Sequence, residues 1–493
     1  MEGVLVLAPV AALALFAISS PAVGRLLKSV GKEKYLSLWS ALGFAVAMLC
    51  LAYLSQDLPL EYPEVSSPLF PTFYLDWLSL FFAAVFAFLG FMASLYSTNY
   101  MEHYTGLTQY YTLLLLMVAG MVGVVISADL FTLYIFWELM AVSSYCLVAF
   151  KVKEWEPVEA GMKYALMSTV GSIVMLYGFS YLYGVAGTLN LFALAEAVSK
   201  APPSPFLYGA LASLVFGFGI KAAMVPLHTW LPDAHPAAPS PISAMLSGVV
   251  IKVGVYALMR FVPYIFPLTT YDWPLVFAIA AVLSMTAGNI LALLQDDIKR
   301  LLAFSSINQV GYILIGIAIA TKDGLVGSVL HFFAHATMKG LAFLCAGALF
   351  YVLGTRSLTK LTGAGRKMPI TTVTFSIALF GLIGAPPLNG FISKFILFTA
   401  AVAASGVHSW APWLAVAGVL NSAFSAAVYL RVLWKLLLDE PSEEVAQKAR
   451  DPPFWMAAIM IVLAAVVVST GMFPEAVVAL AEKAAEDLLP FVI

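Results

Sequence analysis

The side chains that could do chemistry in this sequence are ionisable groups placed inside apolar segments. Such groups interrupt runs of hydrophobic residues at five positions: Glu138, Lys221, Lys252, Lys339 and Lys394. A charge at the centre of a bilayer costs about 2.5–3.5 kcal/mol on insertion scales, so these residues normally face a bundle interior or a water path. We therefore expect them to mark a proton or ion route.

A histidine-rich segment points to the same chemistry. His331, His335 and Lys339 follow one another at intervals of four residues, so on a helix they share one face, with neighbours about 6 Å apart. Histidine titrates near neutral pH, and a buried lysine can lose its proton. The stripe predicts a proton relay. Two histidines at this spacing could also bind a metal ion, but no carboxylate or cysteine lies near them, so we expect no metal site.

Plainer explanations exist for some of these charges. A lysine near the end of a span can extend its ammonium to the membrane surface without any further role, and we expect this for Lys163. Asp76 and Asp129 are expected to be span-end residues of the same kind. Glu138 could be a structural hydrogen-bonding residue. Four buried cations against one anion exceed what structure requires, which favours a functional interpretation.

Two apolar segments are interrupted by proline. Proline removes an amide hydrogen and frees carbonyls of the preceding turn, which is tolerated at membrane depth only where the backbone is packed by protein or wet. Interrupted helices in corresponding positions of two halves point to an inverted-repeat transporter and its ion site. The residues expected to shape and support such a site are Pro226, His228, Asp233, His235, Pro386 and Pro387.

The elements that position these residues must be membrane helices. Of 493 residues, 62% are hydrophobic and only 11% are charged, against about 25% charged in soluble domains. We predict an all-α polytopic membrane protein of about 14 transmembrane helices, with two inverted five-helix repeats that each contain a broken helix. Each expected span approaches the ~20 residues that cross a bilayer. The spans are 4–18, 35–54, 73–96, 110–127, 130–150, 161–185, 206–225, 241–261, 274–294, 301–320, 325–353, 369–401, 412–438 and 454–472.

The spans group into four units. We expect an N-terminal three-helix segment (1–105), a first five-helix repeat (106–262), a second, inverted repeat (273–438), and a last span with an interfacial helix (453–493). The amphipathic segments 191–199 and 475–489 are predicted to lie at the membrane surface. No soluble domain fits between the spans.

The distribution of basic residues predicts the orientation in the cell membrane. Cytoplasmic loops are enriched in Lys and Arg, and one side of the predicted topology holds seventeen basic residues whereas the other holds four, Lys200, Arg260, Lys322 and Lys483. Both termini are then outside. The seventeen cytoplasmic residues are Arg25, Lys28, Lys32, Lys34, Lys151, Lys153, Lys163, Lys299, Arg300, Arg356, Lys360, Arg366, Lys367, Arg431, Lys435, Lys448 and Arg450.

Composition also argues against several functions. The net charge is only −2, so nucleic acid is not an expected partner. The three cysteines form no C-x-x-C pair, which makes iron–sulfur clusters, structural zinc and a disulfide framework unexpected. We expect no cofactor and no catalytic redox centre in this chain.

Several motifs resemble the antiporter-like subunits of respiratory complex I, a family shared with Mrp-type Na+/H+ antiporters and membrane-bound hydrogenases. The resemblance covers nearly the whole chain, and its most specific part runs for more than thirty residues from Gly219. It is carried by FWELM around Glu138, GIK ending at Lys221, PLHTWLPDAH from Pro226, KVGVY from Lys252, LQDDIKRLLAFSS from Leu294, HATMK from His335 and GFISKF around Lys394.

The resemblance implies a role for each buried charge. Members of that family have fourteen helices with two inverted five-helix repeats, and a line of charged residues and water runs along the midplane. Matched residue by residue, Glu138 on helix five would pair with Lys221 on broken helix seven. The remaining members of the line would be Lys252 on helix eight, His331, His335 and Lys339 on helix eleven, and Lys394 on broken helix twelve.

The same resemblance implies a proton-translocating subunit of a multi-subunit Mrp-type cation/proton antiporter, or of a related redox-driven complex such as a membrane-bound hydrogenase or sulfur reductase. The partners would be other membrane subunits, joined in redox-driven forms by peripheral subunits with iron–sulfur or NiFe centres. The transported ions would be H+ and, in antiporters, Na+.

Departures from the family pattern narrow the subtype. Lysine at position 394 disfavours the complex I paralogue that has glutamate there, and the short chain after the last span disfavours the largest paralogue and the large Mrp subunit. We expect the D-type Mrp subunit or its archaeal hydrogenase or sulfur-reductase counterpart. The smallest antiporter-like subunit of quinone-reducing complex I is the alternative. A stand-alone secondary transporter of a small solute is an alternative from another class, and it would need a solute-sized polar pocket.

Overall fold

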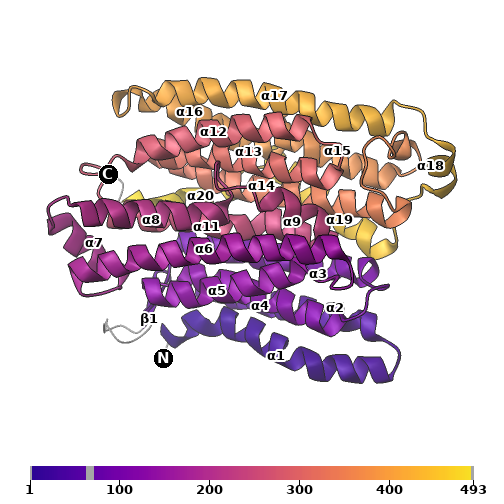
Figure 1. Ribbon diagram of the computed structural model, residues 1–493, viewed down its shortest axis with the longest axis horizontal. Helices are drawn as coiled ribbons and strands as arrows, with labels where there is room; N and C mark the ends of the chain where they lie inside the picture. Colours follow the sequence, from indigo (N-terminus) through magenta and orange to yellow (C-terminus); the bar gives the residue numbers. More distant parts are fainter. Residues whose placement is uncertain (1–2, 63–71, 490–493) are drawn as a thin grey trace.

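The computed structural model describes residues 3–62 and 72–489. In this part of the chain, fourteen helical segments are long and apolar enough to cross a membrane, which confirms the all-α polytopic prediction. The helices run roughly parallel to one another through the bundle (Figure 1).

The spans lie close to their predicted positions. The transmembrane and broken helices are α1 (Ala8–Ser29), α2 (Leu36–Leu54), α3 (Trp77–Tyr100), α4 (Leu107–Ile126), α5 (Leu130–Val148), α6 (Trp155–Ala186), α8 (Pro205–Ala222), α9 (Leu231–Ala237), α10 (Ser240–Met245), η3 (Leu246–Val250), α11 (Ile251–Ile265), α12 (Trp273–Leu293), α13 (Ile298–Ile319), α14 (Lys322–Leu353), α15 (Pro369–Ile383), α16 (Asn389–Ala403), α17 (Ala411–Leu437) and α19 (Phe454–Met472).

The remaining elements are short or lie at the ends of the bundle. They are η1 (Gly3–Leu7), η2 (Glu33–Tyr35), β1 (Leu60–Tyr62), β2 (Phe73–Leu75), α7 (Leu191–Lys200), η4 (Ala364–Arg366), η5 (Ala404–Gly406), α18 (Glu443–Lys448) and α20 (Glu475–Glu486). Strands β1 and β2 pair antiparallel, with Leu60 opposite Leu75. The helices α7 and α20 coincide with the predicted segments 191–199 and 475–489.

The first span is longer than predicted. The predicted span ends at residue 18, before Ser19, Ser20 and Pro21, but α1 continues to Ser29. Both serine hydroxyls donate to carbonyls of the preceding turn, at 2.7 Å to Leu15 and Phe16, so their polarity is satisfied within the helix. Arg25 and Lys28 therefore lie in the last turns of α1 rather than in a loop.

The two predicted repeats share the same order of helix neighbours. In the first, α4 packs on α5, α6 on α8, and α8 on α11; in the second, α12 packs on α13, α14 on α16, and α16 on α17. The fourth transmembrane helix of each predicted repeat is broken. The break in the first half follows α8 at Ala223, which adopts a left-handed conformation (φ 55°), and in the second half it follows α15 at Gly384 (φ 93°).

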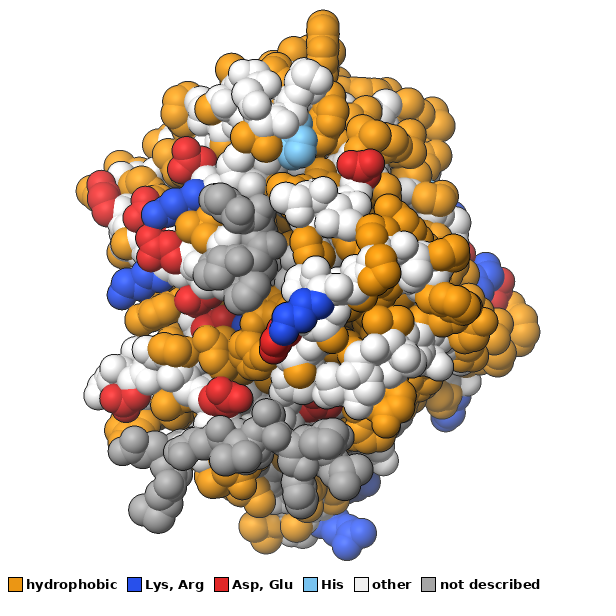
Figure 2. All heavy atoms as spheres, turned by 90° about the vertical axis from the view of Figure 1, so that its left-hand side faces the viewer, with side chains coloured by type: hydrophobic (Ala, Val, Ile, Leu, Met, Phe, Trp, Pro, Cys, Tyr) orange, Lys and Arg blue, Asp and Glu red, His pale blue; other side chains and the backbone are white. Residues whose placement is uncertain are grey.

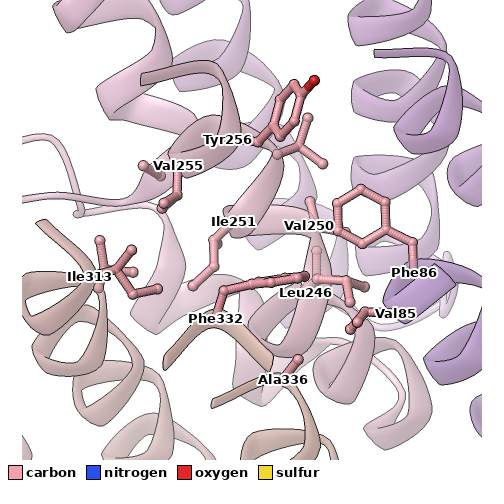
Figure 3. Packing of buried hydrophobic residues seen from close by; sticks show 14 of the residues in the cluster. Val85, Phe86, Leu246, Val250, Ile251, Val255, Tyr256, Ile313, Phe332 and Ala336 are labelled. Carbon is pink, nitrogen blue, oxygen red and sulfur yellow. The ribbon is translucent and has the colours of Figure 1, made fainter. Parts of the chain in front are cut away.

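Both termini lie at one end of the bundle, together with the β-hairpin and α7 (Figure 1). Figure 2 looks onto this end, where charged side chains are scattered among hydrophobic and polar ones. The centre of the molecule is apolar: Figure 3 shows Ile251 and Val255 of α11 beside Phe332 of α14, with Phe86 of α3 on the other side.

The helices that carry the site are packed backbone against backbone. A Cβ added to Gly254 of α11 would lie 2.4 Å from the Ala222 nitrogen and 2.7 Å from the Phe218 oxygen of α8. We expect Gly254→Leu to push these helices apart and to lower the melting temperature by an amount equivalent to about 3 kcal/mol. A Cβ at Gly184 meets nothing within 4 Å, so Gly184→Leu is the control. Thermal melting in detergent tests this, and equal melting temperatures for both variants would contradict it.

Candidate proton-relay site

All of the predicted relay lysines and histidines are buried. The exposed fractions are 1% for Lys221, 3% for Lys394, and zero for Lys252, Lys339, His331 and His335. Glu138 differs, because its residue is only half-buried on α5 although its Oε1 atom is enclosed and has no hydrogen-bond partner in the described structure. Ionisable groups buried in a membrane bundle normally face its interior or a water-filled cavity and pair with one another or with backbone carbonyls.

Lys221 and Glu138 are near each other but not in contact. The Lys221 ammonium donates to the Tyr164 hydroxyl at 2.8 Å and lies 4.9 Å above the centre of its ring. Among the described residues, no carboxylate oxygen lies within 4.0 Å of the Lys221 ammonium, the limit for an ion pair. The Glu138 carboxylate interacts with this ammonium only electrostatically, at longer range. The direct pair implied by the resemblance is therefore open in this conformation, with Tyr164 in place of the carboxylate.

The tyrosine is itself held in position. Its hydroxyl lies 2.8 Å from the Ser144 hydroxyl, and its ring stacks on Trp230 with centroids 4.0 Å apart. The indole nitrogen of Trp230 donates to the Ile220 carbonyl at 2.8 Å, an acceptor near the broken end of α8. The motif after the break thus fixes the position of Lys221.

Lys252 is positioned by an irregular turn. The helix that carries Lys252 is wound as a π-helix over Leu246–Val250, and only Ile251 separates this turn from Lys252. The Lys252 ammonium donates to the Ser247 carbonyl, five residues earlier, at 2.7 Å. Single π turns occur mostly at functional sites, and here the turn gives a buried cation a neutral acceptor and no carboxylate.

The stripe on α14 is present, and its members have different partners. His331 lies between Gln309 Oε1 (3.1 Å) and Ser393 Oγ (3.0 Å). His335 has no hydrogen-bond partner among the described residues, and its ring centroid is 6.4 Å from that of His331. Lys339 donates to Ser305 Oγ at 2.5 Å and to the Leu302 carbonyl at 3.0 Å.

Lys394 uses the carbonyls that the second broken helix leaves free. Its ammonium donates to Leu382 and Ile383 at 2.8 and 3.1 Å, the last two residues of α15. It also lies 4.2 Å from the centroid of the Tyr312 ring. Pro386 and Pro387 lie in the connection between α15 and α16, so carbonyls at this break accept hydrogen bonds from a buried ammonium.

Electrostatic interactions link several of these groups. His335 lies within electrostatic range of Lys252, Lys339, His331 and Lys394, and Lys252 is within range of Lys339. At the other end, the backbones of α11 and α8 touch at Gly254, where an added Cβ would lie 2.9 Å from the Lys221 carbonyl carbon. Apart from Glu138, the ionisable members are lysines and histidines.

The supporting residues divide into two groups. Pro226 and His228 lie in the turns between α8 and α9, and His235 is fully buried, stacked 4.4 Å from Phe343. Asp233 is not in the line: it pairs with Lys163 (3.2 Å) and Arg300 (3.3 Å) at the bundle surface. Lys163 is half-exposed, also pairs with Glu159, and is outside the line, as expected.

Three residues expected at span ends or in a loop lie at span ends and are buried there. Lys299, in the first turn of α13, donates to the Ala238 carbonyl at 2.8 Å. Asp76 caps α3 and forms a buried ion pair with Arg260, 2.5 Å apart. These contacts join residues that are far apart in the sequence, so sequence spacing alone does not reveal them. Asp129 caps α5 by accepting from the Thr132 amide.

Metal ligation finds no support in the part of the chain that the structure describes. No group of three His, Cys, Asp or Glu side chains there could hold a metal ion. Cys50, Cys146 and Cys345 are free thiols.

Comparison with known proteins agrees with this geometry. Residues 127–425 match the family model "NADH:quinone oxidoreductase/Mrp antiporter, TM", and residues 68–111 match "NADH-Ubiquinone oxidoreductase (complex I), chain 5 N-terminus". The F(420)H(2) dehydrogenase subunit N of Methanosarcina mazei is 34% identical over 85% of this chain and 86% of its own. The NADH-quinone oxidoreductase subunit N of Desulforudis audaxviator is also 34% identical, over 80% of each chain.

Solved structures extend the likeness to the entire chain. A chain of the membrane-bound sulfane sulfur reductase, an archaeal respiratory membrane complex, superposes with a TM-score of 0.88 at 27% identity over 100% of both chains. A chain of the Mrp complex from Dietzia gives 0.85 at 25% identity over 97% of both chains. The protein belongs to the antiporter-like membrane subunits of the NADH:quinone oxidoreductase/Mrp antiporter family.

Proposed function

We propose that this chain moves protons through the buried line Glu138–Lys221–Lys252–His335–Lys394 as one subunit of a redox-driven membrane complex. The observation that carries the proposal is the set of buried bases held by neutral partners: carbonyls, hydroxyls and ring faces, as at Lys252 and Lys394. A lysine held in this way can exist with or without its proton, because no carboxylate locks it in the charged form.

The Glu138 carboxylate provides the means of control. When it approaches Lys221, both groups are favoured in their charged forms. When it withdraws or is neutralised, the Lys221 ammonium is left with the Tyr164 hydroxyl in an apolar site, and transfer of its proton toward Lys252 becomes favourable. One opening of the pair then drives one proton step along the line.

Lys394 is the far end of this line. Its ammonium is held by the freed carbonyls of α15 and the Tyr312 ring, so it can receive a proton from the α14 histidines and pass it on. The His331 ring is held between Gln309 and Ser393. In this orientation it can carry the proton from His335 to Lys394.

The relatives favour a subunit N type of redox-driven assembly. Two relatives at 34% identity carry subunit N names in an F420H2 dehydrogenase and a quinone oxidoreductase. These names shift the preference from the Mrp D-type subunit to the smallest complex I paralogue and its archaeal counterparts. We infer that the partners are further membrane subunits and peripheral redox subunits, and that both termini face the outside.

Purification of the assembly tests this proposal. A tag on this chain should bring down redox subunits, and vesicles containing the complex should acidify or alkalinise when its electron donor and acceptor are added in sodium-free buffer. Proton movement that requires Na+ and no electron donor would instead support the Mrp-type alternative. The observation in favour of that alternative is the TM-score of 0.85 to a chain of the Dietzia Mrp complex.

A stand-alone transporter of a polar solute has less support. The hollows of about 550 and 600 Å³ beside α15–α19 and α8–α12 are lined almost wholly by apolar side chains, and a polar solute needs convergent polar groups. A hollow of about 700 Å³ has the charged residues Lys448, Arg450 and Asp451 in its lining, but none of the buried relay residues lines it. Transport of a small solute by the lone chain in liposomes would favour this alternative.

A further inference from the structure

A second polar stripe runs along α11, away from the buried line. Lys252, Tyr256 and Arg260 follow at intervals of four residues, so they share one helix face with about 6 Å between neighbours. All three are buried, and none is more than 4% exposed. The stripe leads from the middle of the bundle toward the end that carries β2, the start of α3, and α20.

Hydrogen bonds continue the stripe from Tyr256 to a carboxylate. The Tyr256 hydroxyl donates to the Val125 carbonyl at 2.6 Å and lies 3.0 Å from the Ser79 hydroxyl. The Ser79 amide donates to Asp76 Oδ1 at 2.9 Å. Arg260 pairs with the other oxygen of Asp76 at 2.5 Å. Ser79 therefore contacts the tyrosine through its hydroxyl and the Asp76 carboxylate through its backbone amide.

A second carboxylate reaches this cluster from the opposite end of the sequence. Asp487, which follows α20, accepts from the Leu78 amide at 3.3 Å and lies within electrostatic range of Asp76 and Arg260. The other ionisable groups that face the cluster are Tyr74, Tyr256, Tyr264 and Glu61. Two carboxylates thus share one guanidinium. Burial, and then the charge of Asp76, raise the pKa of Asp487 to about 6.

An apolar layer separates this cluster from the buried line. Phe82 and Phe332 stack with centroids 3.9 Å apart, and Phe82 also contacts the Tyr256 ring at 5.1 Å. Figure 3 shows the layer around Phe86, Phe332 and Ile251, with the Tyr256 hydroxyl turned away from it. The layer would keep the line and the cluster apart until water enters.

We propose that Asp487, held beside the Asp76–Arg260 pair, forms a second outlet, which releases protons from Lys252 at the membrane face carrying α20 in addition to those that leave through Lys394. The inference rests on the proposed function, because it supplies an outlet for a proton that reaches Lys252. It assigns a role to a stripe that the line of Glu138 to Lys394 does not use.

The proton steps balance without any oxidant or reductant. An N–H bond of the Lys252 ammonium breaks, and water that enters the apolar layer carries the proton to the hydroxyls. The Tyr256 and Ser79 hydroxyls each accept a proton on oxygen and give up the one they held. A further water carries the proton from the Ser79 hydroxyl to the Asp487 carboxylate, which gains an O–H bond and then loses that proton to bulk water, while Arg260 keeps its charge throughout.

Docking of α20 alone would not require Asp487. Lys322 of α14 pairs with Glu486 at 2.7 Å, and Lys483 lies 4.1 Å from the centroid of the Trp77 ring. These two contacts hold α20 against α14 and α3, so removal of the Asp487 charge should leave the helix in place.

The test is the rate of proton translocation by the reconstituted complex as the pH on the α20 side is varied. Above about pH 6 Asp487 is ionised and can accept a proton, whereas below it the carboxyl is already protonated. The wild-type rate should therefore fall as the pH on that side drops through about 6. Asp487→Asn should be slower, by the share of the protons that this outlet releases, and should lose this step. Asp487→Glu should keep the step, and Glu482→Gln, an exposed carboxylate on the same helix, should match the wild type.

Each contrary result has a distinct meaning. An Asp487→Asn complex with the wild-type rate and pH profile would overturn the inference, and so would a slow complex that keeps the step, since that is only a structural loss. If Asp487→Asn fails to assemble, Tyr256→Phe takes its place: a slow rate supports the outlet, and a wild-type rate refutes it. Normal pumping by Lys252→Met would instead contradict the proposed function itself.

Discussion

Replacing Lys252 with methionine should stop proton translocation while the complex still assembles. Lys252 is fully buried, and its ammonium contacts a carbonyl rather than a carboxylate. It is the member of the line that lies between the Lys221 half and the α14 histidines. Loss of a group that directly transfers a proton lowers the rate about a hundredfold or more, and methionine fills nearly the same volume without offering a base.

The thermal stability of the Lys252→Met complex should not fall with its translocation rate. Removing a buried charge together with its need for solvation is often neutral or stabilising when an apolar residue of similar size replaces it. We expect the melting temperature of Lys252→Met to equal or exceed that of the wild type. Lys360→Met, which alters an exposed lysine, should leave both the rate and the melting temperature unchanged. A Lys252→Met complex that is slow only because it melts early would count against the assignment.

Glu138→Gln should slow translocation by a similar factor, because the amide cannot attract the Lys221 ammonium. The carboxylate has an enclosed, unpartnered Oε1 atom on a half-buried helix face, so it is free to move toward or away from Lys221. Without this movement, Lys221 stays with Tyr164 and the trigger for the proton step is lost. Proton uptake by vesicles measures the effect.

Two variants make this test specific. Glu138→Asp keeps the charge on a shorter side chain and should retain part of the rate. Glu159→Gln removes an exposed carboxylate that pairs with Lys163 at 3.0 Å and should have no effect. If Glu138→Gln pumps normally with all subunits present, the charge at position 138 is not the trigger.

Much of this arrangement could be predicted from the sequence. A lysine within an apolar span has few options, so burial of Lys221, Lys252, Lys339 and Lys394 followed from their surroundings alone. The breaks at Pro226 and at Pro386–Pro387 followed from the geometry of proline. Spacing by four residues placed His331, His335 and Lys339 on one face of α14.

Other parts depend on contacts that sequence does not encode locally. The open state of the Glu138–Lys221 pair depends on Tyr164, which is 57 residues from Lys221. The π turn that provides an acceptor for Lys252 has no marker in the sequence. Asp76 and Arg260 are 184 residues apart, so each looked like an ordinary residue at a span end until the fold paired them.

The measurement that tests the connected line most directly is proton translocation by four complexes studied side by side: Glu138→Gln, Lys221→Ala, Lys252→Met and Lys394→Ala. The four positions lie on α5, α8, α11 and α16, so they share no local structure, only the proposed path. If protons follow this path, all four complexes should assemble. Glu138→Gln, Lys221→Ala and Lys252→Met should lose translocation, Lys394→Ala should fall to the rate that the second outlet sustains, and Lys360→Met and Glu159→Gln should retain the wild-type rate. A wild-type rate in any one of the four assembled complexes would show that protons do not pass through that group.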